Sequence, residues 1–118
     1  MSKFDEPKTI GLTAKNKEYL SEFIVLEYFA EQTDAYKFAV AYALKNKIDP
    51  PKTMSNTTTF AVGSLDSNRE LYDLVISLKP DLDQSIYKYI QDLANWGIEK
   101  LYSIYKDDHK LDLLKLIE

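Results

Sequence analysis

The stretch Ala35-Tyr36-Lys37-Phe38-Ala39-Val40-Ala41-Tyr42-Ala43-Leu44 carries the pattern that decides the fold class of this chain. Apolar residues recur along it at helical spacing, and one face carries Ala35, Phe38, Ala39 and Tyr42. A helix that is apolar nearly all round is typically central, and its small side chains let a second helix approach closely. We therefore predict a central helix over about 34–46.

The partner of this helix is predicted over about 84–106, the longest amphipathic stretch of the chain. Its apolar stripe consists of Ile86, Ile90, Leu93, Ala94, Gly97, Leu101 and Ile104. Three further helices are predicted over about 14–30, 68–79 and 109–117, and Thr13 is a suitable N-cap for the first of them. The pattern as a whole predicts a mostly α fold of about five helices.

Two short extended segments accompany these helices. Residues 8–13 predict an N-terminal strand, with Ile10 and Leu12 on one side and Thr9 on the other. A second short extended segment is expected near 58–65, where the sequence is rich in β-branched residues.

The chain has 118 residues, which suits one domain. We expect a disordered leader over 1–7 and a single helical domain over 8–118. The longest apolar runs are far shorter than the roughly 20 residues that span a bilayer, and the N-terminus lacks the apolar core of a signal peptide. The protein is therefore expected to be cytoplasmic, with no membrane contact.

The composition removes whole classes of chemistry. The chain has no Cys and one His, which excludes thiol nucleophiles, disulfides, Cys-ligated zinc and any site with two His ligands. His109 lies in the charged stretch 106–110, which is typical of a solvated helix junction rather than of a catalytic base. We predict no metal and no cofactor, and a role that is not enzymatic.

The order of strand 8–13, helix 14–30, turn 31–34 and helix 34–46 resembles the ribbon-helix-helix unit. That resemblance implies a strand that pairs with its twin from a second subunit and enters the major groove. The same layout is similar to the small helical protein of bacterial DNA phosphorothioation systems, which implies a role in phage defence.

The residues that could contact nucleic acid under this resemblance are Lys3, Lys8, Thr9, Lys15 and Lys17. The overall charge argues against generic duplex binding, because the net charge is -4 and duplex affinity depends on neutralising phosphates. The outward positions of the strand carry short side chains, which reach little of a groove. Dimerisation is therefore favoured over DNA reading.

The segment 57–66 is dense in hydroxyl groups and ends in an Asp. It resembles a stretch of small bacterial and prophage proteins of similar length. One interpretation is a loop that binds a phosphate or a peptide through Thr59, Gly63, Ser64 and Asp66. The favoured interpretation is a strand followed by a helix that Asp66 or Ser67 caps.

Aromatic residues are in excess, with nine Tyr and one Trp. Tyr and Trp are enriched at interfaces because each combines a large apolar body with a polar tip. The predicted interface consists of Ile10, Leu12, Tyr87, Trp96 and Tyr105.

The function that the sequence favours is that of a small, non-catalytic bacterial accessory protein. It would form a homo-oligomer and bind a macromolecular partner, either another protein or, less favoured, DNA. One alternative is a ribbon-helix-helix-like DNA-binding regulator. A second alternative is a small metal-dependent hydrolase, for which the candidate acid pairs are Asp81 with Asp83, Asp107 with Asp108, and Asp66 with Glu70 or Asp73.

Overall fold

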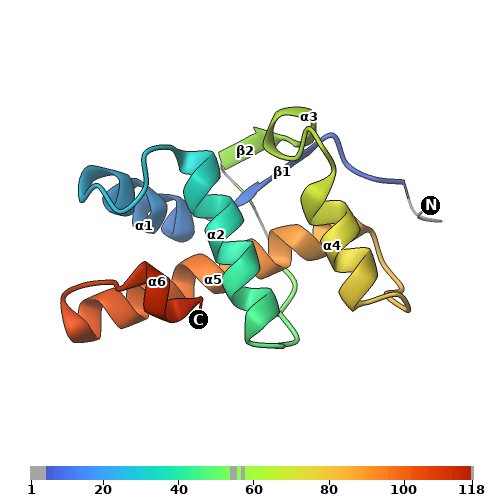
Figure 1. Ribbon diagram of the computed structural model, residues 1–118. Coiled ribbons are helices and arrows are strands. Elements are labelled where there is room, and N and C mark those ends of the chain that lie inside the picture. The colour runs from blue at the N-terminus through green and yellow to red at the C-terminus, as the bar shows by residue number, and fades with distance from the viewer. Residues whose placement is uncertain (1–4, 54–55, 57, 118) are drawn as a thin grey trace.

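A computed structural model describes residues 5–53, 56 and 58–117 of the chain (Figure 1). The fold is mostly helical, as predicted, with a short two-stranded sheet. In chain order the elements are β1 (Thr9–Leu12), α1 (Ala14–Val25), α2 (Gln32–Lys45), β2 (Thr58–Ala61), α3 (Val62–Leu65), α4 (Glu70–Leu78), α5 (Ile86–Asp108) and α6 (Leu113–Leu116). The described residues thus hold one short helix, α3, that the sequence pattern did not predict.

The helices α2 and α5 cross at the centre of the molecule (Figure 1), as the Ala-rich pattern predicted. Their backbones approach closely at Gly97. A Cβ added there would lie 2.8 Å from the carbonyl carbon of Ala39 and 2.9 Å from its Cβ, closer than van der Waals contact allows. Glycine at this position is therefore what permits the two central helices to pack.

The strand β1 pairs with β2 of the same chain, antiparallel, with Ile10 opposite Phe60. The amide of Val62 extends the ladder by donating to the carbonyl of Lys8 over 2.9 Å. Ile10 and Leu12 are 2% and 0% exposed and belong to the core. The second extended segment therefore exists, but it ends at Ala61, where the one-turn helix α3 begins.

The helix α1 ends at Val25, five residues before the predicted end. The amide of Glu27 donates to Ile24 and that of Tyr28 donates to Phe23, which closes the last turn in a Schellman motif. Glu27 has a φ of 65°, a conformation usually taken by glycine. The rings of Phe23 and Tyr28 meet edge to face at 6.2 Å and supply the apolar contact typical of this motif.

The start of α5 is held by a residue from the predicted leader. The Glu6 carboxylate accepts from the amides of Ile86 and Tyr87 and from the Ser85 hydroxyl, over 2.7–3.0 Å. These bonds satisfy amides that a helix N-terminus leaves free. Glu6 is thus part of the folded domain rather than of a disordered leader, and residues 1–4 of that leader lie outside the described residues. Within the described ranges, no helix is long and apolar enough to cross a membrane.

Candidate ligand-binding site

The outer edge of β1 is closed by side chains from the central helices. The Gly11 amide donates to Oε1 of Gln91, over 2.9 Å, and its carbonyl accepts from Asn95 Nδ2 and the Tyr36 hydroxyl, both over 3.2 Å. The Thr13 amide donates to Asn95 Oδ1 over 3.0 Å. Pairing with a twin strand would need these same backbone groups. The backbone groups at Gly11 and Thr13 that a twin strand would need are therefore already paired within the chain.

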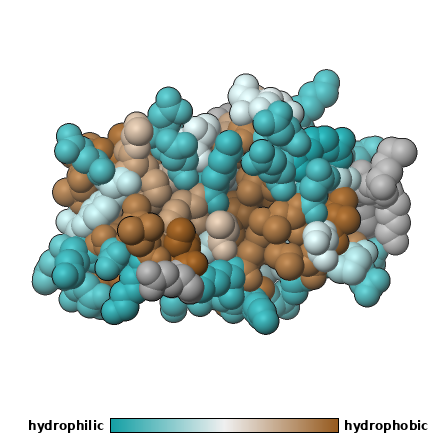
Figure 2. Space-filling model, in the orientation of Figure 1, coloured by the Kyte–Doolittle hydropathy of each residue, from teal (hydrophilic) through white to brown (hydrophobic). Residues whose placement is uncertain are grey.

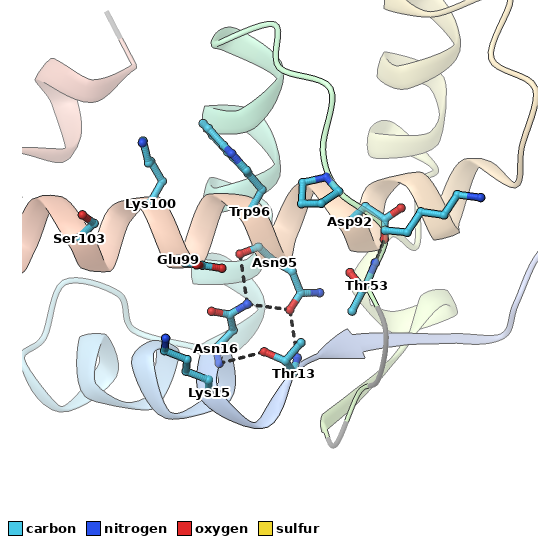
Figure 3. A pocket seen from close by; sticks show the side chains of 12 residues that line it. Thr13, Lys15, Asn16, Thr53, Asp92, Asn95, Trp96, Glu99, Lys100 and Ser103 are labelled. Atoms are coloured by element: carbon cyan, nitrogen blue, oxygen red, sulfur yellow. Dashed lines mark hydrogen bonds between the residues drawn. The ribbon is translucent and has the colours of Figure 1, made fainter.

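Asn16, in the first turn of α1, adds a second amide to this cluster (Figure 3). Its Nδ2 donates to both the backbone carbonyl and Oδ1 of Asn95, over 3.2 and 2.9 Å. These two acceptors fix the orientation of the Asn16 amide. Its Oδ1 is buried and has no hydrogen-bond donor, although the residue is only 3% exposed. A buried acceptor without a donor is costly and calls for an explanation.

The segment 51–53 crosses the middle of α5 and is tied there by one hydrogen bond. The Thr53 amide donates to Oδ1 of Asp92 over 2.9 Å, and Asp92 is 6% exposed. The Thr53 hydroxyl is buried and, like Asn16 Oδ1, has no hydrogen-bond partner among the described residues. Asn16 Oδ1 and the Thr53 hydroxyl are thus two buried polar atoms without a partner. The residues that carry them contact neighbouring positions of α5, Asn95 and Asp92.

A pocket of about 510 Å³ opens between α1, α5 and this segment. Small-molecule sites commonly enclose between about 300 and 1,000 Å³. Its lining includes Asn16, Thr53 and Asn95, and Figure 3 shows Trp96 and Lys100 projecting from α5 at its border. The two unpaired polar atoms therefore belong to residues that line one pocket.

Trp96 forms the aromatic wall of the pocket. Its ring stacks on Tyr42, with centroids 6.0 Å apart and planes inclined by 22°. The ammonium of Lys100 lies 6.0 Å from the indole centroid. Tyr42 thus supports the ring from the α2 side, and Trp96 remains half-buried at the border of the pocket.

The lining carries three lysines, Lys15, Lys52 and Lys100, against the two acids Asp92 and Glu99. The first turn of α1 holds no acidic residue, so the positive end of its dipole is not offset there. The local charge is therefore positive in a chain of net charge -4. A second cavity of about 640 Å³ lies beyond segment 51–53 and shares Lys52 and Asp92 with the first.

Two buried tyrosines near Asp92 stay neutral well into the alkaline range. Burial raises the pKa of Tyr36, and the negative charge of Asp92 raises it further. Burial likewise raises the pKa of Tyr89, with smaller effects from Asp49 and Asp92. Tyr36 therefore acts as a hydroxyl donor to β1 rather than as a proton acceptor in the site.

The predicted interface residues do not lie together. Ile10, Leu12 and Tyr87 are buried in the core of the chain, and Tyr87 also lines a separate cavity of about 380 Å³. Tyr105 is half-buried, and its ring contacts those of Phe23, Tyr28 and Tyr102. Of the five, Trp96 borders the pocket.

The predicted nucleic-acid residues are also dispersed. Lys15 lines the pocket, whereas Lys17 lies exposed on another face of α1. Lys8 and Thr9 are exposed where β1 begins. Lys3 lies outside the described residues.

The predicted binding loop turns out to hold a helix cap. Asp66 is 6% exposed, and its carboxylate accepts from the amides of Leu71 and Tyr72 in α4 and from the Tyr87 hydroxyl. The capping interpretation of Asp66 is thus confirmed, and its oxygens are engaged within the chain. Gly63 and Ser64 are exposed in α3, and the Thr59 side chain lies outside what the structure describes.

The acids named for a hydrolase do not converge. Among the described residues, no group of three or more His, Cys, Asp or Glu side chains could hold a metal ion. Asp66 is engaged as a cap, and Asp81, Asp83, Asp107 and Asp108 are exposed at the two ends of α5. The hydrolase alternative gains no support from this arrangement.

The sequence interpretation missed the residues that build the pocket, above all Asn16, Thr53, Asp92 and Asn95. Asn16 and Asn95 lie beside the apolar stripes of their helices, where a polar residue is usually solvated. A usable signal existed in Gln91 and Asn95, two amides one turn apart on the longest helix.

No protein-family model matches this sequence, and no match was found among curated proteins or solved structures.

Proposed function

We propose that this is a non-catalytic binding protein that acts on a macromolecular partner through the Trp96 pocket. The observation that carries the proposal is the pocket itself: one cavity of about 510 Å³ is lined by an aromatic ring, three lysines and two residues, Asn16 and Thr53, that each bury a polar atom without a partner. Partner binding was predicted with Trp96 as an anchor, and Trp96 borders this cavity.

The chemistry of the lining supports binding rather than catalysis. A nucleophile needs an adjacent base, and catalytic bases are most often His. The described residues that line the pocket offer amides, hydroxyls and lysines, and its buried acid, Asp92, holds the Thr53 amide. The cysteine-free composition is compatible with the bacterial cytoplasm, which the proposal assumes as the location.

Crosslinking in cells tests this proposal. A photo-crosslinking amino acid at Ser103, an exposed lining position, should form an adduct of defined mass. The same group at Lys37, exposed on α2 and away from the pocket, is the matched control. Trp96→Ala should abolish the Ser103 adduct. An adduct that forms equally from Lys37, or that survives Trp96→Ala, would contradict the proposal.

Self-association stays a separate prediction. Since β1 is paired within the chain, two copies would have to meet through another surface. Figure 2 shows apolar surface beside α4, where Leu74 and Leu78 are 41% and 53% exposed. Light scattering at micromolar concentration tests the prediction, and a mass of one chain would remove it.

A further inference from the structure

We infer that the Trp96 pocket binds a nucleotide that is not base-paired, with the base against Trp96 and the phosphate near Lys100, the lysine beside the indole ring. The inference rests on the proposed function and names the chemistry of its ligand. Because the proposed partner is a macromolecule, the nucleotide is a unit of a single strand, and a free nucleotide, which has the same planar ring, N–H donors and phosphate, serves as its smallest probe.

The aromatic wall suits a base. Stacking on a protein ring is open to every base, because each has a π-face, and it contributes about 1–3 kcal/mol per base. Trp96 meets this requirement, since Tyr42 supports one side of the indole and the pocket contacts the ring. A base in a duplex is covered by its neighbours above and below, so this mode selects an unpaired nucleotide.

The charges suit one phosphate. Lys15, Lys52 and Lys100 border the same cavity, and the start of α1 adds backbone amides with no acid in its first turn. Against the two acids of the lining, this surplus is small. It fits a ligand with one phosphate better than a duplex, whose binding neutralises many phosphates and suffers from the overall charge of -4.

The unpaired acceptor supplies an independent reason. Asn16 Oδ1 lacks a donor, and its amide cannot rotate to find one because Nδ2 holds two acceptors on Asn95. This oxygen is itself buried, so a base N–H or a sugar O–H would satisfy it only after a small shift of the lining toward the cavity. The buried Thr53 hydroxyl can pair with either a donor or an acceptor.

The fluorescence of Trp96 provides a direct test, because it is the single tryptophan of the chain. The full-length protein is titrated with adenosine monophosphate, adenosine, a single-stranded oligo(dA), the matching duplex and the dipeptide Gly-Phe with a free carboxylate. Quenching by the monophosphate and the single strand, with weaker quenching by adenosine and by the duplex, is the expected result. The relative affinity of the first two distinguishes a free nucleotide from a strand.

Substitutions test the contributions of the Lys100 charge and of the Trp96 ring to binding separately. Lys100→Gln should weaken binding and reduce its salt dependence, whereas Lys37→Gln, exposed on α2, should leave both unchanged. Calorimetry with Trp96→Phe and Trp96→Ala replaces fluorescence, and the Ala variant should bind about tenfold more weakly than the Phe variant, which keeps a ring. Circular dichroism confirms that each variant is folded.

The failures of the two proposals are distinguishable. Quenching by Gly-Phe alone, or equally by Gly-Phe and the nucleotides, would overturn the nucleotide inference and leave partner binding intact. The same follows if no probe quenches while the Ser103 adduct forms and proves to be a protein. If no probe quenches and no pocket-specific adduct forms, both proposals are wrong.

Discussion

Two clusters of buried polar groups lie along α5, and they differ in how completely their atoms are paired. The carboxylate cluster, at the start of the helix, consists of Glu6, Asp66, Ser85 and Tyr87, and every described carboxylate oxygen in it accepts at least one hydrogen bond. The amide cluster, in the middle, consists of Thr13, Asn16, Gln91 and Asn95, and Asn16 Oδ1 has no donor.

This difference in hydrogen bonding indicates that the carboxylate cluster stabilises the fold, whereas the amide cluster can also bind a ligand. A cluster with all groups paired holds segments together and has nothing left to offer. A cluster that leaves an acceptor unpaired beside a pocket loses stability there, and a ligand can recover it. The contrast makes predictions about stability that can be measured without knowing the ligand.

Asp66→Ala should have the largest effect, a loss of about 3 kcal/mol in the free energy of unfolding. The change removes the acceptor of two α4 amides and leaves the buried Tyr87 hydroxyl without its partner. Urea denaturation measures the loss, with Asp81→Ala, an exposed loop position, as the control. Equal stability of the two variants would show that the carboxylate cluster is not structural.

Within the amide cluster, Asn95→Ala should lower the free energy of unfolding more than Asn16→Ala does. Asn95 pairs with Gly11, Thr13, Asn16 and the backbone of Gln91, so its loss should cost about 2 kcal/mol. Asn16 already leaves one acceptor unpaired, and its loss should cost only about 1 kcal/mol. Urea denaturation compares the two variants, and a larger loss for Asn16→Ala would contradict the contrast between paired and unpaired groups.

The same contrast explains how far the sequence could be read. Apolar spacing predicted the central pair of helices, because burial of a stripe is a property of one helix and is visible locally. Thr13 was correctly predicted as the N-cap of α1, and its hydroxyl accepts from the backbone amide of Asn16. Asp66 was also identified as a cap, since short oxygen side chains before a helix are strong local signals.

What the sequence could not predict depends on contacts between distant segments. Asn16 and Asn95 are 79 positions apart, and only the fold brings their amides together. The early end of α1 was missed because Glu27 occupies a position where glycine is the usual signal. The pocket was missed because it too depends on distant segments: its polar lining forms only when segment 51–53 lies against α5.

Alkaline pH should weaken the carboxylate cluster through Tyr87, and the contact of β1 beside the amide cluster through Tyr36, whose hydroxyl donates to the Gly11 carbonyl. Burial first, and then the hydrogen bond to Asp66, raises the pKa of Tyr87, and burial raises that of Tyr36 beside Gly11. Because the folded pKa values exceed the unfolded value of about 10, their contribution is fully present below pH 10 and is lost as pH rises through the folded pKa.

Tyr102 lies outside both clusters and loses its proton within the pH range in which the prediction can be measured. Its hydrogen bond to Glu22 raises the pKa of Tyr102 to about 12, with burial as the second cause. Urea denaturation between about pH 10 and 12 should show a falling free energy of unfolding, and the fall should be less steep in Tyr87→Phe than in the wild type. A slope unchanged in Tyr87→Phe would show that the carboxylate cluster does not oppose ionisation.

Lys100→Gln and Lys52→Gln should have the smallest effect on stability, below about 0.5 kcal/mol each. Both side chains are exposed at the border of the pocket, and the described contact of Lys100 there is a ring 6.0 Å from its ammonium. Urea denaturation of the two variants, with Lys37→Gln beside them, measures the effect. A loss of stability as large as that of Asn16→Ala would mean that these lysines stabilise the fold. A negligible loss would mean that they are available to a ligand, unlike the paired groups of Asn95, which hold the fold together.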